Sequence, residues 1–268
     1  MVYGKRFFHT QIYQASRQWL GKLQQFVLPP CCVACGATSY QSTPVVKRTL
    51  DLCAACQAQL PTNLHACQHC GLPLTGTQAP LICGRCLRRP PPYQASFCAY
   101  EYAYPIEHLI RRLKYHHALM HAQVLGYLLA EYLRDRHVGP WPECFIPMPL
   151  HPVRYRARGY NQVIELGRFL ERELKITMRT DLVERIRYTP EQAGLSRRER
   201  RKNLRRAFSV TATTTPKHIA LLDDVITTGS TVNELAQSLK RAGVEHIEVW
   251  GLARAAMRNG IEVPTGYS

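Results

Sequence analysis

Apolar residues recur in the second half of the chain at the spacings of helices and of short buried strands. Apolar positions three and four residues apart predict amphipathic helices over about residues 106–114, 124–133, 163–174 and 232–239. Short apolar or alternating runs predict strands near residues 97–102, 144–146, 219–222 and 244–250. Strands that alternate with helices indicate an α/β fold with a mainly parallel sheet.

The stretch from Ile219 to Thr231 places polar groups directly after one of these strands. Asp223 and Asp224 follow four apolar residues, and a loop of small residues then leads into a helix: Thr227, Thr228, Gly229, Ser230 and Thr231. Backbone N–H groups, hydroxyls and the helix dipole favour a phosphate at such a loop. Ligands of open α/β sheets bind at the carboxyl ends of strands, so we expect a phosphate site beside two carboxylates. The alternative is an ordinary strand-to-helix turn.

A second loop, rich in proline and arginine, follows the strand near 144–146. We expect it at the same edge of the sheet, because it too connects a strand to a helix. Its arginines are suited to a diphosphate or to a nucleic-acid backbone: Arg154, Arg156 and Arg158. The alternative is a solvated basic loop.

Basic residues outnumber acidic residues in this chain of 268 residues. Lys and Arg number 35 against 19 Asp and Glu, which gives a formal net charge of +16. Such an excess indicates a polyanionic partner, although net charge also serves solubility. Residues 188–206 are strongly basic, and we consider a solvated face, a lid over the site, or a contact with single-stranded DNA. The candidate nucleic-acid residues are Arg154, Arg156, Arg197, Arg198, Arg200, Arg201, Lys202 and Arg205.

The amino terminus has no apolar segment typical of a signal peptide, and no run of 18 apolar residues occurs in the chain. We therefore expect a cytoplasmic protein without a transmembrane segment, which reaches the inner membrane face only through partners.

Cysteine is concentrated between residues 31 and 86. Eight of the 11 cysteines form Cys-x-x-Cys pairs: Cys32 and Cys35, Cys53 and Cys56, Cys67 and Cys70, Cys83 and Cys86. In a reducing compartment this pattern predicts two structural Cys₄ zinc sites. Pairing in sequence order is the simplest, interleaved pairing stays open, and Cys31 could replace Cys32. We expect Cys98 and Cys144 to be buried thiols.

The acid pair and the Thr-Thr-Gly-Ser-Thr loop resemble the phosphoribosyl-pyrophosphate (PRPP) motif of type I phosphoribosyltransferases. The resemblance implies that Asp223 and Asp224 hold the ribose hydroxyls and that residues 227–231 hold the 5′-phosphate. It also implies Mg²⁺ with PRPP and, in an active enzyme, catalytic roles for Asp223, Asp224 and Arg158.

Several motifs in order resemble the ComF/GntX family of DNA-uptake and DNA-utilisation proteins. They are the Cys pairs, Leu113-Lys114-Tyr115, Pro147-Met148-Pro149-Leu150, Arg158-Gly159-Tyr160-Asn161-Gln162, the basic run and the PRPP motif. The resemblance implies an N-terminal extension with a short amphipathic helix (1–28), a double zinc-ribbon-like module (29–92), a phosphoribosyltransferase-like domain (93–256) and a polar tail (257–268). Arg88-Arg89-Pro90-Pro91-Pro92 would be the linker between the module and the domain.

Three functions are compatible with these features. The first is the handling of imported single-stranded DNA, with the pocket retained for PRPP or a related phosphoribosyl ligand. The second is an active, Mg²⁺-dependent phosphoribosyltransferase with an unidentified acceptor. The third is a zinc-dependent adaptor for a helicase-like or recombination partner of DNA uptake.

Overall fold

The computed structural model describes residues 31–38, 51–74, 81–188, 206–211, 215–255, 257–258 and 261–262. The chain divides into two compact units, residues 1–59 and 60–268. The described part of the first unit contains the first two Cys pairs and one short helix, α2 (Ala54–Ala58). The predicted N-terminal helix lies outside the described residues.

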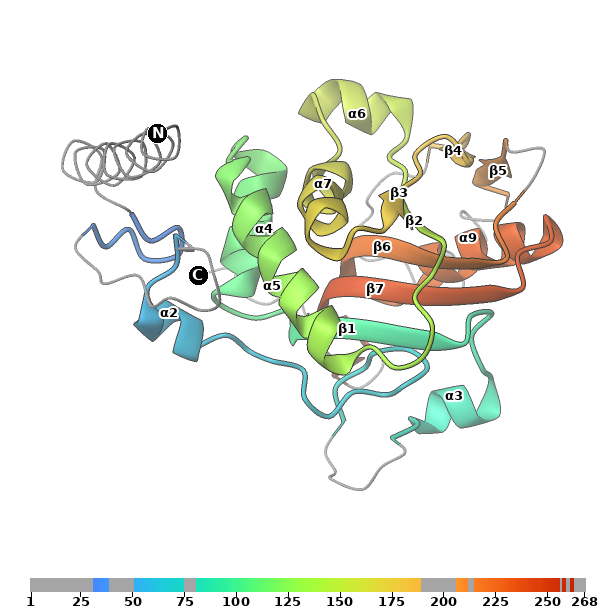
Figure 1. The fold of residues 1–268 in the computed structure, drawn as a ribbon, viewed down its shortest axis with the longest axis horizontal. Helices are drawn as coiled ribbons and strands as arrows, with labels where there is room; N and C mark the ends of the chain where they lie inside the picture. The colour runs from blue at the N-terminus through green and yellow to red at the C-terminus, as the bar shows by residue number, and fades with distance from the viewer. Residues whose placement is uncertain are drawn as a thin grey trace, which may run out of the picture. The chain divides into compact units, whose positions relative to one another are not determined.

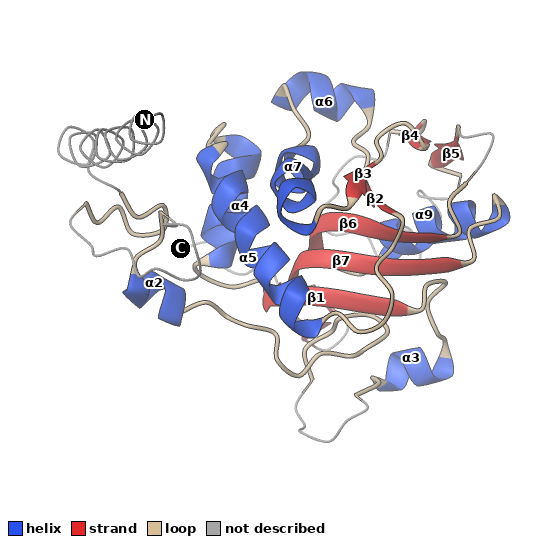
Figure 2. Cartoon of the chain, viewed as in Figure 1, coloured by secondary structure: helices blue, strands red, loops and turns tan. Residues whose placement is uncertain are grey.

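A five-stranded parallel sheet forms the centre of the second unit (Figures 1 and 2). Its strands, in the spatial order β1-β7-β6-β2-β3, are β1 (Ala95–Glu101), β7 (His246–Arg254), β6 (His218–Ile226), β2 (Cys144–Pro147) and β3 (Thr177–Met178). Apolar residues fill its central strands, as expected for a sheet covered on both faces. The predicted mainly parallel α/β fold is therefore confirmed.

Helices cover both faces of this sheet. Two connections run in one direction across the sheet: β1 is joined to β2 through α4 (Ile106–Tyr115) and α5 (Met120–Arg136), and β2 is joined to β3 through α7 (Gln162–Leu174). The connection from β6 to β7, through α9 (Ser230–Arg241), runs in the opposite direction. Because such crossovers are right-handed, the two directions place helices on opposite faces (Figure 1). The predicted apolar stripe of α4 is buried: Ile106, Leu109, Ile110 and Leu113.

The segment 60–74 follows the free edge of β1. The N–H group of Asn63 donates to the carbonyl of Ala99 (2.9 Å), and that of Glu101 donates to the carbonyl of Pro61 (2.8 Å). These bonds pair backbone groups that an edge strand would otherwise leave open. The second pair of Cys-x-x-Cys motifs thus belongs to the same compact unit as the sheet. The division between the units, at Gln59 and Leu60, falls at a different point from the linker predicted at 88–92.

Smaller elements complete the second unit. α3 (Gly84–Arg88) precedes β1, and α6 (Pro152–Arg158) precedes α7. β4 (Val183–Arg185) pairs antiparallel with β5 (Phe208–Val210), and these two strands flank the basic run. β8 (Met257–Arg258) pairs with β9 (Ile261–Glu262) in the segment predicted to be a polar tail.

In the described parts of the chain, no helix is both long enough and apolar enough to cross a lipid bilayer.

Candidate functional site

The acid pair lies near the carboxyl end of β6, the strand between β2 and β7. β6 continues through Ile226, so Asp223 and Asp224 belong to the strand itself rather than to the loop after it. Successive side chains of a strand point to opposite faces, and the two carboxylates therefore have different surroundings.

Asp224 is buried beneath two helices, with 4% of its surface exposed. Its Oδ2 lies 2.9 Å from Nζ of Lys114, on α4, and accepts a hydrogen bond of 3.1 Å from Nε2 of Gln162, on α7. The N–H group of Val225 donates to its other oxygen, Oδ1 (2.8 Å). The carboxylate thus has a counter-charge and hydrogen bonds, which a buried ion requires.

Asp223 is only partly buried, and its Oδ1 accepts a hydrogen bond of 3.0 Å from the N–H group of Asp224. Loss of hydration, followed by repulsion from the Asp224 carboxylate, raises the pKa of Asp223 well above its ordinary value. Burial by itself would lower the pKa of Lys114, but attraction to Asp224 outweighs burial and raises that pKa. Lys114 therefore stays charged, whereas Asp223 ionises less readily than an ordinary aspartate.

The predicted phosphate loop lies between β6 and the first turn of α9. Gly229 caps α9 with a positive φ of 74°, a conformation that favours glycine. The hydroxyls of Thr228 and Ser230 are 2.8 Å apart, and the N–H group of Ser230 donates to Oγ1 of Thr228 (3.2 Å). No acidic residue occupies the first turn of α9. The loop thus combines hydroxyls, free helix N–H groups and a positive dipole end, which favour an anion.

The arginine-rich segment after β2 reaches the same edge of the sheet, because the N–H group of Met148 donates to the carbonyl of Leu222 (2.8 Å). The prediction of a continuous loop here was wrong: residues 152–158 form α6, with Pro152 at its first position and Gly159 at its end. Arg158 donates a short hydrogen bond to Oε1 of Gln162 and lies 5.5 Å from the ring centroid of Tyr115. It is therefore linked to Asp224 through Gln162.

The other candidate nucleic-acid residues are divided between described and undescribed parts of the chain. Arg156 is exposed on α6, and Arg154 is partly buried on the same helix. The remaining six lie outside the described residues: Arg197, Arg198, Arg200, Arg201, Lys202 and Arg205.

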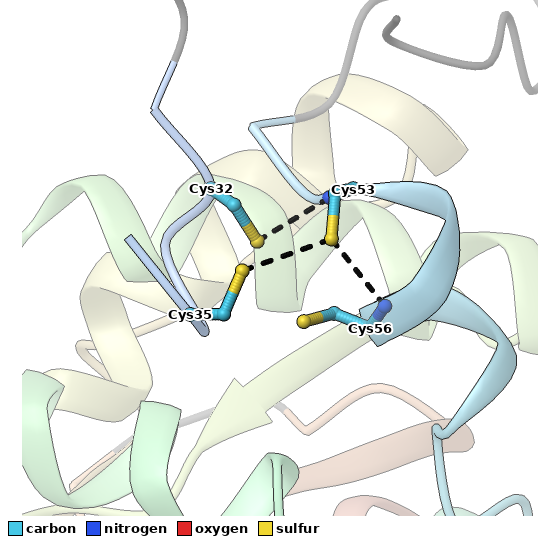
Figure 3. A group of neighbouring side chains, drawn as sticks. All are labelled: Cys32, Cys35, Cys53 and Cys56. Carbon is cyan, nitrogen blue, oxygen red and sulfur yellow. Dashed lines mark hydrogen bonds between the residues drawn. The ribbon is translucent and has the colours of Figure 1, made fainter. Parts of the chain in front are cut away.

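Two Cys₄ clusters form, each from consecutive Cys pairs, so interleaved pairing is excluded and Cys31 is not a member. The first contains Cys32, Cys35, Cys53 and Cys56, whose sulfur atoms converge from a turn and from the start of α2 (Figure 3). The second contains Cys67, Cys70, Cys83 and Cys86, all of them buried. In each cluster the first pair forms a turn closed by a glycine, and the second pair brackets the start of a short helix.

The donor geometry of both clusters fits zinc. Sγ of Cys35 and Sγ of Cys53 are 3.8 Å apart, and Sγ of Cys70 and Sγ of Cys83 are 3.7 Å apart. Tetrahedral zinc with Zn–S bonds near 2.3 Å separates its sulfur ligands by about 3.8 Å. Burial acts to raise the pKa of Cys32, but N–H donors, first that of Cys53, outweigh burial and lower the pKa to about 6. Such donors favour the thiolate, which is the form that binds metal.

Sequence reasoning did not select three residues that are central to this geometry: Lys114, Gln162 and Arg254. Lys114 and Gln162 stand in motifs that were used only for the family resemblance. A usable signal was the position of Lys114, four residues after the buried Ile110, at the margin of an apolar stripe. Arg254 ends an apolar strand and is 0% exposed, which the sequence pattern does not indicate.

The buried ion pair predicts an unequal response to two substitutions on α4. Lys114→Met leaves the Asp224 carboxylate buried without its counter-charge, and we expect the free energy of unfolding to fall by about 3 kcal/mol. Chemical denaturation of the zinc-loaded protein measures the change.

Arg111→Met is the matched control, since Arg111 forms an exposed pair with Glu107 on the same helix (3.6 Å). We expect it to cost less than about 1 kcal/mol. Equal costs for the two variants would contradict the importance of the Lys114–Asp224 pair.

Comparison with known proteins identifies the Cys-rich region and the family of this chain. Residues 23–87 match the family model described as a double zinc ribbon domain. Competence protein F of Haemophilus influenzae is 40% identical over 210 residues, which cover 76% of this chain and 90% of that protein. DNA utilization protein YhgH of Escherichia coli K12 is 38% identical over 206 residues, with the same coverage of 76% and 90%.

Solved structures of phosphoribosyltransferases also align with this chain. The purine phosphoribosyltransferase of Pyrococcus horikoshii is 17% identical, with a TM-score of 0.30 over 55% of this chain and 93% of that chain. The two long sequence matches, together with the double zinc ribbon, show that the chain belongs to the ComF/GntX family of competence and DNA-utilisation proteins.

Proposed function

We propose that this protein acts on imported single-stranded DNA, in competence or in the use of DNA as a nutrient, and that the carboxyl edge of its sheet binds a 5′-phosphoribosyl ligand such as PRPP. The observation that carries the proposal is the arrangement at that edge: Asp223 lies near the carboxyl end of β6, the 227–231 loop follows β6, and the arginine-bearing α6 follows the neighbouring strand β2. The names of the relatives, which refer to competence and DNA utilisation, support the biological role. The eight cysteines of the two clusters are free thiols rather than disulfides, which supports a cytoplasmic location.

In the proposed pocket, the loop N–H and hydroxyl groups bind the 5′-phosphate, and Asp223 accepts hydrogen bonds from the ribose hydroxyls. Asp224 does not bind the ligand itself, because its carboxylate is already bonded to Lys114 and Gln162; it positions these two side chains. Arg158 would bind the diphosphate. The Mg²⁺ that accompanies PRPP would neutralise part of the charge of that group.

The proposed DNA surface is formed by the end of α4, by α6 and by the basic run. Tyr115 and Tyr155 are 58% and 50% exposed and stand among arginines of these helices. Exposed aromatic rings between basic groups suit single strands, since bases stack on the rings while the cations bind phosphates. The rings of His151, which caps α6, and of Tyr188, where the basic run begins, are 5.2 Å apart. This contact places Tyr188, the first residue of the basic run, beside α6.

A second candidate is an active phosphoribosyltransferase, in which pyrophosphate leaves as a cationic ribosyl centre develops. The hydrogen bonds that link Arg158 through Gln162 to Asp224 favour it. Arg158 and Mg²⁺ would stabilise the leaving group, and Asp223 would orient the ribose. A protein partner of the helicase or recombination class is compatible with either function.

The pocket predicts that PRPP binding depends on ionised Asp223. We expect Asp223→Asn to weaken binding by about tenfold or more, since a hydrogen bond to a charged group contributes about 1.5–3 kcal/mol. Calorimetric titration with PRPP and Mg²⁺ measures the affinity. Because the pKa of Asp223 is raised in the free protein and the ligand favours its ionised form, wild-type affinity should increase above pH 7 until Asp223 is ionised.

Asp181→Asn is the control, since Asp181 is an exposed acid that pairs with Arg179 (2.7 Å). We expect unchanged affinity for this variant, and no rise of affinity with pH above 7 for Asp223→Asn. Wild-type affinity in Asp223→Asn would remove Asp223 from the pocket.

The DNA surface predicts that charge reversal on α6 weakens single-stranded DNA binding. Arg154→Glu with Arg156→Glu removes two phosphate contacts, which should reduce the slope of log affinity against log salt by about 1.4 for a single strand. Fluorescence anisotropy of a labelled oligonucleotide at several salt concentrations measures both quantities.

The control is Arg168→Glu with Arg172→Glu, which changes the net charge by the same amount as the α6 double variant. Both residues lie on α7, with side chains 63% and 47% exposed. We expect this control to leave the salt dependence unchanged. Similar losses in both double variants would mean that only net charge matters.

A further inference from the structure

A single buried guanidinium connects the second Cys₄ cluster to the phosphate loop. Arg254, the last residue of β7, is 0% exposed. Its Nε donates to the carbonyl of Cys70 (3.0 Å), and its Nη1 donates to the carbonyl of Ile226 (2.8 Å). Nη1 also donates to the carbonyls of Thr227, in a short contact, and of Ala255 (3.0 Å). The side chain therefore joins a ligand residue of one cluster to the point where β6 enters the loop.

The chemistry of this contact is specific to arginine. A buried cation is costly unless its N–H groups are hydrogen-bonded. Nε and Nη1 of Arg254 donate to backbone carbonyls, whereas Nη2 is buried without a hydrogen-bond partner among the described residues. No carboxylate of the described residues pairs with the side chain. The rigid fork of a guanidinium can hold carbonyls on two sides at once, whereas a lysine ammonium is a single point charge. Arg254→Lys, which keeps the positive charge but loses the fork, therefore tests the role of the guanidinium.

The Cys70 turn is itself fixed against the sheet. The N–H group of Ser96, on β1, donates to the carbonyl of Gln68 (2.9 Å), and Nδ2 of Asn63 donates to the carbonyl of Gly71 (2.9 Å). Gly71 has a φ of 66°, and a Cβ there would lie 2.2 Å from Sγ of Cys98. The turn thus packs directly on β1, which pairs with β7, the strand that carries Arg254.

We propose that Arg254 is a positioning residue through which the second Cys₄ cluster fixes the geometry of the phosphate loop. Zinc would be held by Cys67, Cys70, Cys83 and Cys86 and would make the Cys70 turn rigid. Arg254 then holds the carbonyls of Ile226 and Thr227 in place, so that the loop N–H groups keep one arrangement. Only the ligand-affinity part of this inference rests on the proposed function.

Hydrogen–deuterium exchange of the zinc-loaded full chain tests the connection without any ligand. In Arg254→Lys we expect the backbone amides of residues 223–235 to exchange at least about fivefold faster than in wild type. This factor corresponds to the loss of one hydrogen bond. Zinc content should stay at the wild-type value and exchange in α5 should not change, which distinguishes positioning from general destabilisation. Wild-type exchange at 223–235 in this variant would overturn the proposal.

The two clusters provide a matched pair of further variants. Cys70→Ser should accelerate exchange at 223–235 as Arg254→Lys does, whereas Cys35→Ser, in the first cluster, should leave it unchanged. Equal acceleration by the two serine variants would overturn the proposal, because zinc at either cluster would then act alike. If wild type failed to bind PRPP, the proposed pocket would fail while the exchange result would still decide the role of Arg254.

Discussion

The parallel pairing of β6 with β2 on one side and with β7 on the other determines where the chemistry of this protein lies. Parallel neighbours end at the same edge, so residues distant in sequence meet there. Asp223 and Asp224 come from β6, the α6 arginines follow β2, and Arg254 ends β7. A sheet with another strand order would separate these groups.

Burial of Asp224 imposes a second constraint, on the helices. A carboxylate at 4% exposure needs a counter-charge, which Lys114 supplies from α4, and a hydrogen-bond donor, which Gln162 supplies from α7. The two helices are thereby held over the same end of β6. Asp223 accepts a hydrogen bond from the N–H group of Asp224 but forms no ion pair among the described residues, and loss of hydration raises its pKa.

The two Cys₄ clusters share a local design, and the second belongs to the compact unit that contains the sheet. The second is hydrogen-bonded along the edge of β1 and through Arg254 to β6. Its zinc site is consequently part of the α/β unit, and its binding energy contributes to the folding of that unit.

Sequence patterns predicted the elements with strong periodicity. The apolar stripes of α4, α5 and α7, the central strands and the consecutive pairing of the Cys motifs are confirmed, because burial and metal geometry leave a clear pattern. α6 was missed, since its seven residues bury no apolar face. The boundary between the units and the role of Arg254 depend on long-range hydrogen bonds, which leave no periodic signal.

Calorimetric titration of the zinc-loaded wild-type chain with PRPP and Mg²⁺ tests the central claim most directly. We expect saturable binding of PRPP, and the same preparation should also bind a single-stranded oligonucleotide. The result would contradict a phosphoribosyl pocket at the sheet edge if the protein bound the oligonucleotide, but PRPP gave no binding heat and did not compete with the oligonucleotide at a saturating concentration.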